Sequence, residues 1–313
     1  MQKIALVMPY YGKLPVYLNY WLRSLQGKML DVLFFSDLDV KEYPENFYPI
    51  KMTFVEFKKL AKEKLGVPVR IDSPRRLCDF KPMYGKIFED CLSNYDYWAF
   101  GDCDLVYGNK LNDEIADALK TNCDVFSGDA FFCSGPFCMI RNRPELNNLY
   151  RKADNWRSVV ASAGDDCLAF DELCGFWHFQ LRRGEMTIED CRCHMDSFSA
   201  VVMREPGLRL HFKTILYQED LSRGEVVRMI PDGRLYADKE GIAVYHWVRA
   251  KMKRCFTYTK VPYKGVQGYR ICKTGFYNDG WQWHCHAPIS IFRLIRAKCV
   301  GAIHKLNKLG FLK

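Results

Sequence analysis

The chain has 313 residues, of which 49% are hydrophobic and 27% are charged, so it can bury a substantial core in one large domain or two small ones. Its formal net charge is +9, but six of these positive charges lie in residues 290–313, where no acidic residue occurs. The other residues carry only +3, which argues against a nucleic-acid partner, and no run of 18 apolar residues predicts a transmembrane helix.

The first elements of the chain are predicted to be a strand, a helix and a strand. Residues 4–8 form a short apolar run that Pro9 ends, residues 15–26 carry apolar side chains at helical spacing, and residues 31–37 form a second apolar run. The first run is too short for a signal peptide and no cleavage site follows it, so we expect a cytoplasmic protein. The 14 cysteines are scattered, and in that compartment we expect reduced thiols.

The next segment carries the signals of a complete helix. Thr53 followed by Glu56 fits a capping box, and Gly66 fits a C-cap. The elements expected after it are a helix at 81–95 and strands at 95–102 and 123–129. Strands that alternate with helices predict an α/β fold with a Rossmann-like, mainly parallel sheet flanked by helices. In such sheets ligands bind at the carboxyl ends of the strands.

The segment "WAFGDCDLVYGN", residues 98–109, places two carboxylates at the end of an apolar strand. Residues two apart on extended backbone point to the same side, so Asp102 and Asp104 can face a common point. Two buried anions repel each other, and Mg²⁺ or Mn²⁺ would relieve that repulsion while keeping open positions for substrate phosphates. We interpret the pair as a metal–diphosphate site; the alternative is a solvated turn.

Several motifs together resemble bacterial glycosyltransferases of the GT-A fold. They are "PYYG" at 9–12, Asp37 after the second strand, "RRLCDFKPMYG" at 75–85 and "FGDCDLVYGN" at 100–109. The resemblance covers roughly residues 1–250 and is strongest to an uncharacterised family tied to surface-polysaccharide synthesis. It implies that Asp104 binds the metal and that Asp102 contacts metal or ribose. The nucleoside pocket would be lined by Pro9, Tyr10, Tyr11 and Asp37.

Basic residues and a late histidine would complete the donor site. Arg75, Arg76 and Lys81 are candidate partners for the diphosphate or the ribose, because arginine and lysine pair with phosphate; the alternative is a solvated basic loop. In several GT-A families a late histidine binds the metal and a following lysine meets the phosphate. The resemblance implies these roles for His246, near the end of a strand at 242–247, and for Lys251. A packing role for His246 is the alternative.

The acceptor side is expected in "AGDDCLAFDELCGFWHF", residues 163–179, where acids lie between aromatic residues. Sugars stack on aromatic faces and hydrogen-bond to carboxylates, and an inverting transferase needs a carboxylate base near the acceptor hydroxyl. Asp171 or Glu172 is the candidate base; the alternative is that these acids cap a helix or face solvent. Ser134 and Gly135 would form a neighbouring wall that lets substrate approach the backbone.

We predict a GT-A-like domain at 1–250 that acts as a metal-dependent glycosyltransferase of the hexosyltransferase type. It would move a sugar from a nucleoside-diphosphate sugar, with a UDP-sugar favoured, to a glycan or lipid-linked acceptor. The alternatives are a nucleotidyl- or phosphotransferase with the same site, and a non-catalytic carbohydrate-binding protein. Residues 251–313 form an extension that ends in a basic amphipathic helix at 290–313. We expect one of two roles for that helix. It lies on the anionic inner face of the cell membrane, or it packs on the body of the protein with its charges outward.

Overall fold

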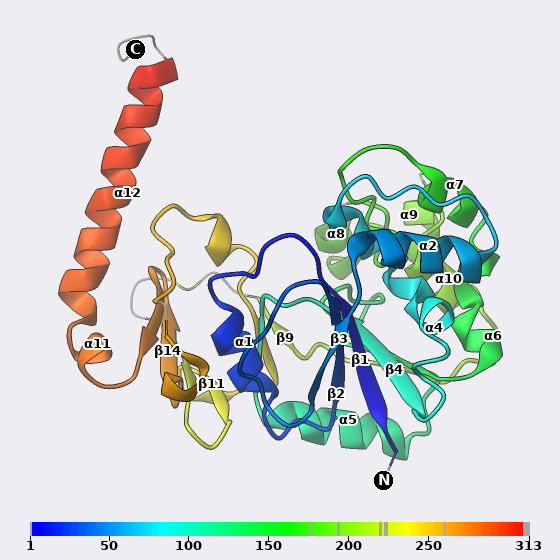
Figure 1. The fold of residues 1–313 in the computed structure, drawn as a ribbon, viewed down its shortest axis with the longest axis horizontal. Helices are drawn as coiled ribbons and strands as arrows, with labels where there is room; N and C mark the ends of the chain where they lie inside the picture. The colour runs from blue at the N-terminus through cyan, green and yellow to red at the C-terminus, as the bar shows by residue number, and fades with distance from the viewer. Residues whose placement is uncertain are drawn as a thin grey trace.

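The computed structural model describes residues 2–175, 177–192, 195–218, 221, 225–259 and 261–308. A seven-stranded sheet forms its centre, with helices on both sides (Figure 1). Its strands are β1 (Ile4–Pro9), β2 (Asp31–Ser36), β3 (Phe47–Lys51), β4 (Tyr97–Gly101), β6 (Val125–Ser127), β7 (Phe137–Arg141) and β8 (Leu210–Phe212). Their spatial order is β3-β2-β1-β4-β7-β6-β8.

The central sheet is largely parallel. β1 pairs in parallel with β2 and β4, and β2 pairs in parallel with β3. Within this sheet β7 runs against its neighbours, since it pairs antiparallel with β4 and with β6, whereas β6 and β8 are parallel. The predicted α/β fold with a mainly parallel sheet flanked by helices is therefore confirmed, and the arrangement is compatible with a Rossmann-like fold.

The helices differ widely in length. The longer ones are α1 (Leu18–Leu25), α2 (Phe54–Leu65), α5 (Lys110–Lys120) and α12 (His286–Lys308). The shorter ones are α3 (Leu77–Phe80), α4 (Tyr84–Ile87), α6 (Pro144–Asn147), α7 (Trp156–Ala161), α8 (His178–Arg182), α9 (Ile188–Arg192), α10 (Phe198–Arg204) and α11 (Trp281–His284). Single 3₁₀ turns are η1 (Pro74–Arg76), η2 (Lys81–Met83), η3 (Leu149–Lys152), η4 (Ala250–Met252) and η5 (Tyr263–Gly265).

Both faces of β1 pack against hydrophobic side chains, and this explains why its sequence is apolar throughout. All six of its residues are buried, and the side chains of the first five alternate between two hydrophobic clusters. Ala5 and Val7 join the cluster that contains side chains of α2, α4 and α7, whereas Ile4 and Leu6 join the cluster that contains side chains of α1 and α5. A strand covered on both faces must be apolar throughout, which accounts for the continuous apolar run in the sequence.

The predicted capping box is confirmed. The side chain of Thr53 accepts a hydrogen bond from the backbone N–H of Glu56, and Glu56 in turn accepts one from the backbone N–H of Thr53. At the other end of α2, Gly66 takes the left-handed conformation, with φ 69°. Both ends of α2 are thus capped by the residues that the sequence indicated.

The single helix predicted at 81–95 is wrong. The chain forms η2 and α4 there and then continues in turns up to β4. Pro82 lies in the first turn of the predicted helix, where a proline is tolerated, so it does not account for the early end at Ile87. Gly85 packs directly on the sheet, since a Cβ atom at this position would lie 2.4 Å from the Trp98 ring. Contact with the sheet, not helical periodicity, therefore determines the path of this segment.

Two smaller sheets complete the fold. One joins β5 (Leu105–Tyr107), β13 (Val244–His246) and β9 (Leu216–Tyr217), with β13 in the middle. The other has the order β12-β11-β10-β14-β15, formed by β10 (Val227–Met229), β11 (Leu235–Ala237), β12 (Glu240–Gly241), β14 (Tyr269–Cys272) and β15 (Gly275–Asn278). The long α12 follows this sheet and extends away from the rest of the chain (Figure 1). The division of the chain at residue 250 stays a prediction.

No helix within the described ranges combines the length and the apolar character that crossing a bilayer requires. The cysteines in the described part of the chain are free thiols.

Candidate active site

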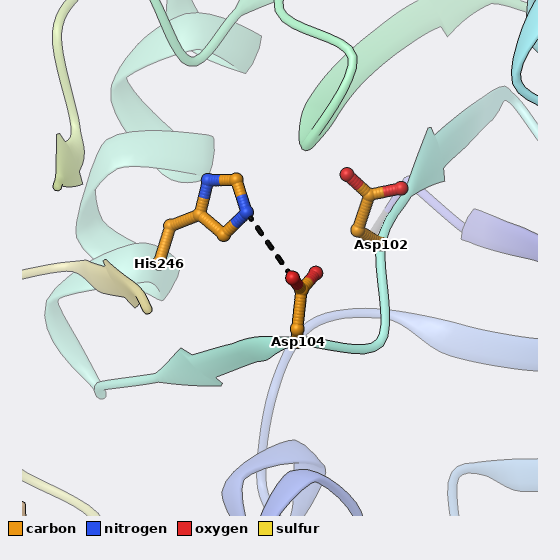
Figure 2. Close-up of side chains that lie close together, drawn as sticks. All are labelled: Asp102, Asp104 and His246. Atoms are coloured by element: carbon orange, nitrogen blue, oxygen red, sulfur yellow. Dashed lines mark ion pairs between the residues drawn. The ribbon is translucent and has the colours of Figure 1, made fainter. Parts of the chain in front are cut away.

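Asp102 and Asp104 lie on the short segment between β4 and β5, at the carboxyl end of β4. β5 pairs antiparallel with β13, and this pairing puts His246 opposite Leu105, the residue after Asp104. The imidazole therefore faces the two carboxylates (Figure 2), and one ligand atom from each of the three side chains lies within 4.8 Å of the others. The structure thus brings together the three residues that the sequence suggested as metal ligands.

The buried carboxylate of Asp104 is paired with positive charge. It is 7% exposed, contacts Lys251 Nζ and lies 3.5 Å from His246 Nε2. Burial would raise the pKa of Asp104, but His246 and Lys251 outweigh burial and hold that pKa below its usual range. Burial likewise lowers the pKa of Lys251, but Asp104 outweighs it and the net shift is upward. At neutral pH the two side chains are therefore an anion and a cation.

The imidazole of His246 has one nitrogen in a hydrogen bond and one without a hydrogen-bond partner among the described residues. Nδ1 lies 3.2 Å from the side-chain amide of Gln218. Nε2 is buried and makes no hydrogen bond within the described residues, because its 3.5 Å approach to Asp104 is too long for a good one. A buried polar atom without a partner is unfavourable, so Nε2 suits a ligand placed between it and the carboxylates.

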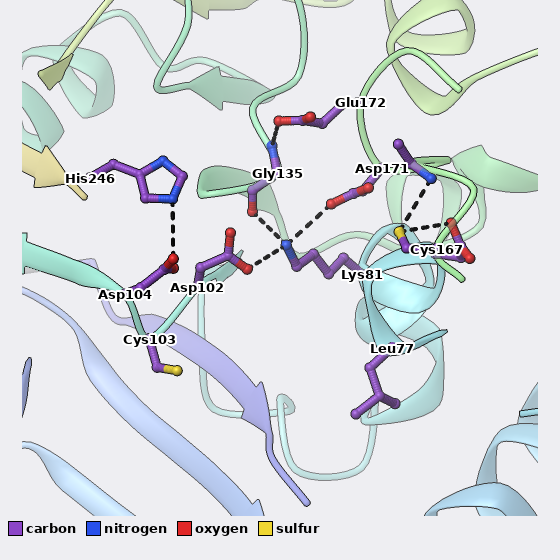
Figure 3. Close-up of polar contacts among 12 residues, drawn as sticks. Leu77, Lys81, Asp102, Cys103, Asp104, Gly135, Cys167, Asp171, Glu172 and His246 are labelled. Atoms are coloured by element: carbon purple, nitrogen blue, oxygen red, sulfur yellow. Dashed lines mark hydrogen bonds and ion pairs between the residues drawn. The ribbon is translucent and has the colours of Figure 1, made fainter. Parts of the chain in front are cut away.

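Lys81 connects Asp102 to a second pair of acids (Figure 3). Its buried ammonium donates to Asp102 Oδ1 at 2.8 Å and to the Gly135 carbonyl at 2.9 Å, and it pairs with Asp171 Oδ2 at 3.2 Å. Burial lowers the pKa of Lys81, but Asp102 and Asp171 outweigh it and raise the pKa well above its usual value. Lys81 is therefore a permanent cation between two carboxylates.

Asp171 and Glu172 are neighbours with different surroundings. Glu172 accepts the N–H of Gly135 at 2.9 Å with one oxygen and contacts His178 Nε2 at 3.0 Å with the other. Burial raises the pKa of Glu172, but His178 and Gly135 outweigh it, so the net shift is downward. For Asp171 burial outweighs the lowering by Lys81, and its pKa lies well above the usual range. Gly135 lies close to these acids, since a Cβ at this position would lie 2.6 Å from Asp171 Oδ2 and would displace that side chain.

One cavity of about 760 Å³ connects all of these groups at the carboxyl ends of β1 and β4. The sequence-predicted residues that line it are Pro9, Tyr10, Tyr11, Arg75, Lys81, Asp102, Asp104, Ser134, Gly135, Asp171, Glu172, His246 and Lys251. The Tyr11 hydroxyl is buried and, in the described part of the chain, has no hydrogen-bond partner. The Tyr10 hydroxyl donates to the Lys13 carbonyl, and burial raises the pKa of Tyr10 to about 12.

Two residues predicted for the donor site do not line this cavity. The buried guanidinium of Arg76 pairs with Asp79 at 2.9 Å and donates to the carbonyls of Val159 and Asp166. These bonds tie η1 to the segment around the end of α7, so the guanidinium serves the fold and does not face a phosphate site. Asp37 follows β2 and is exposed to solvent outside the cavity lining.

Several cavity residues were not singled out from the sequence, namely Asp129, Phe132, His178, Phe179, Arg182 and Arg249, although His178 and Phe179 end the segment 163–179 expected on the acceptor side. Asp129 ends the predicted strand at 123–129, as Asp102 ends its own, and this position could have indicated it. It is buried and pairs with Arg182 of α8. His178 follows Glu172 by six residues without a local pattern that marks it, because the contact depends on where α8 packs.

Comparison with known proteins places these residues within a family. A family of unknown function (DUF6625) matches residues 6–279, which is most of the chain and includes every residue that lines the cavity. The helix α12 lies beyond the matched residues. No curated protein matches the chain.

Proposed function

The chain belongs to the DUF6625 family, and we propose that it is a metal-dependent glycosyltransferase of the GT-A type. It would transfer a sugar from a nucleoside-diphosphate sugar, with a UDP-sugar favoured, to a glycan or lipid-linked acceptor. The observation that carries the proposal is the convergence of Asp102, Asp104 and His246 in a cavity that also contains Asp171 and Glu172. The cavity, at about 760 Å³, has the size of a small-molecule site.

The three converging side chains fit a divalent cation. Carboxylate oxygens suit Mg²⁺ and Mn²⁺, and the added imidazole favours Mn²⁺ of the two. The unpartnered Nε2 of His246 supports the fit, because a ligand would satisfy it. When bound, the cation would stabilise the negative charge that develops on the diphosphate leaving group.

Other cavity residues would bind and orient the donor. Lys251 lies beside Asp104 with about a third of its side chain exposed, so it can exchange this contact for a donor phosphate. The buried hydroxyl of Tyr11 would hydrogen-bond to the nucleoside, which would satisfy an otherwise unpartnered group. Lys81 would keep Asp102 in position, because its ammonium is fixed by three oxygen atoms.

Asp171 is the better of the two candidate bases. Glu172 has both oxygens engaged, by Gly135 and by His178, whereas Lys81 contacts one oxygen of Asp171. Burial also raises the pKa of Asp171, which makes it a stronger proton acceptor once it is ionised. In the proposed step the acceptor oxygen attacks the anomeric carbon, its proton moves to Asp171, and the bond to the diphosphate breaks.

The proposal is tested first by binding. We expect one nucleoside diphosphate from a panel of UDP, GDP, ADP and CDP to raise the melting temperature, and only when Mn²⁺ is present. Asp102→Asn and His246→Ala should weaken Mn²⁺ binding at least about tenfold, measured by the loss of the free-ion EPR signal. Asp166→Asn is the matched control, because this carboxylate is exposed and lies outside the cavity lining. Stabilisation that does not need the metal, or that survives both site variants, would contradict the proposal.

The reaction itself is tested by its products. With the matching nucleotide-sugar and Mn²⁺, slow release of the nucleoside diphosphate is expected even without an acceptor, because water can take the acceptor's place. Asp171→Asn should reduce this release by two or more orders of magnitude while Mn²⁺ binding is retained. Release of a nucleoside monophosphate together with the sugar 1-phosphate would instead indicate a phosphotransferase. Release of pyrophosphate when a nucleoside triphosphate and a sugar 1-phosphate are supplied would indicate a nucleotidyltransferase. Binding of free glycans without any nucleotide binding would indicate a carbohydrate-binding protein.

A further inference from the structure

The helix α12 contacts the rest of the chain through the side that carries Ser290, Arg293 and Gly301. Ser290 Oγ lies 2.8 Å from Thr274 Oγ1 and 3.0 Å from the Tyr277 hydroxyl. Arg293 donates to the Thr274 carbonyl at 3.0 Å and stacks over the Tyr277 ring at 4.3 Å. Further along, a Cβ at Gly301 would lie 3.0 Å from the Arg254 guanidinium. Positions 290, 293 and 301 share one side of the helix, so this side faces the body.

The opposite side of α12 is apolar and exposed. Phe292, Ile295, Cys299 and Ile303 recur at intervals of three and four residues, and Ile291 lies beside them. The three isoleucines and Phe292 are each more than half exposed, and Cys299 is also exposed. This row is displaced by about half a turn from the side that contacts the body. The usual orientation of an amphipathic helix, with its apolar face inward, is therefore reversed.

Basic side chains border this apolar face. Arg296 lies along one edge and Lys298 along the other, and both are exposed. No acidic residue occurs after Asp279, so nothing on this helix offsets their charge. An apolar stripe with cationic edges matches the boundary of a bilayer with anionic headgroups, where the apolar side chains enter the acyl region and the long basic ones reach the phosphates.

We propose that α12 docks the protein onto an anionic lipid bilayer, lying in the plane of the interface with Phe292, Ile295 and Ile303 inserted. The inference does not depend on the proposed function, because it rests on residues outside the cavity. The helix extends away from the rest of the chain (Figure 1), and the exposed fractions of Phe292, Ile295 and Ile303 show that the apolar face is accessible. Contiguous exposed apolar residues on a soluble domain mark an interaction surface, and the basic edges select lipid over an uncharged protein groove.

The test uses the full-length chain and lipid vesicles. Co-sedimentation with vesicles of phosphatidylcholine and phosphatidylglycerol is expected, with much weaker binding to phosphatidylcholine alone and weakening by salt. The double variant Ile295→Asn/Ile303→Asn should lower the partition coefficient at least about tenfold, because two inserted side chains are lost without any change of charge. The variant Arg296→Gln/Lys298→Gln should lower it roughly 30-fold on anionic vesicles.

The matched control is Val300→Asn. Val300 is exposed on the same helix but lies off the apolar face, so this change should alter vesicle binding less than about twofold. Circular dichroism and melting temperature verify that all variants are folded. Absence of vesicle binding by the wild-type chain, or equal binding by Ile295→Asn/Ile303→Asn, overturns the proposal. The proposal is also overturned if light scattering shows a dimer that Ile295→Asn/Ile303→Asn dissociates, because a second copy of the chain would then cover the apolar face.

Discussion

Replacing Lys81 by methionine should destabilise the fold more than any exposed lysine substitution. The ammonium is buried and bonded to Asp102, Asp171 and the Gly135 carbonyl. In the variant, water can replace the ammonium beside Asp102, because this side chain is 31% exposed. Asp171 is only 5% exposed, so it must either keep an unpaired charge or take up a proton. Breaking a buried ion pair typically costs about 3–5 kcal/mol, and we expect a loss in this range at pH 7.

Urea unfolding followed by tryptophan fluorescence measures this loss. Lys86→Met is the matched control, because Lys86 is part of the same segment but forms a partly exposed pair with Glu89, and its loss should stay within about 1 kcal/mol. Adding Asp171→Asn to the Lys81 variant should restore about 2 kcal/mol, since the uncompensated anion is then removed.

The pH dependence of the Lys81 variant follows from Asp171. Burial already raises the folded-state pKa of Asp171, and loss of the lysine charge raises it further. A carboxyl whose folded pKa lies above its unfolded value of about 3.9 weakens folding at higher pH, and this penalty disappears once both states are protonated. The stability gap between Lys81→Met and wild type should therefore narrow as the pH falls from 7 toward 4. A gap no larger than that of Lys86→Met, or no rescue by Asp171→Asn, would refute the reasoning.

Three further predictions concern the scaffold. Asp124→Asn should lower stability by about 2–3 kcal/mol at pH 7, because Asp124 is buried and paired with Arg209. Burial raises the pKa of Asp124, but Arg209 outweighs burial and the folded-state pKa is lowered, so the carboxylate stabilises the fold above about pH 3.9 and this stabilisation is lost as the pH falls below that value. Urea unfolding of wild type and Asp124→Asn at pH 7 and at pH 3 checks this. Gly85→Ala should cost about 1–3 kcal/mol in thermal unfolding, because its Cβ would lie 2.4 Å from the Trp98 ring, and an unchanged melting temperature would contradict this contact. Thr53→Ala should cost about 1 kcal/mol through loss of the N-cap, measured in the same way, and Thr53→Ser should restore it.

The parts of the fold that the sequence predicted are those fixed by local chemistry. β1, β2 and β4 are covered on both faces, so each must be a continuous apolar run that can be recognised without the structure. The caps of α2 depend on residues within one or two turns, and these also were predictable. The three-residue strands β10 and β11 of the second small sheet were not, because so few residues carry no periodic signal.

The candidate site was predictable where it depends on sequence spacing and not where it depends on packing. Asp102 and Asp104 are separated by one residue, so their common orientation follows from the backbone. His246 was suggested only through resemblance, because its partner lies more than a hundred residues away. Lys81 and Arg76 belong to one basic segment and could not be told apart in the sequence. Both side chains are buried, and only the packing of η1 and η2 determines that Lys81 lines the cavity while Arg76 bonds to backbone carbonyls.

The ladder between β5 and β13 makes the alignment of two strands a condition for assembling the site. His246 stands opposite Leu105, and a slip of one residue would turn its imidazole to the other face of the small sheet. Insertions in the segments that precede β13 are tolerable if this alignment is kept, whereas a single deletion inside the strand is not. The pairing of the three-residue strand β13 with β5 therefore sets the position of His246 relative to Asp104, whatever the length of the surrounding loops.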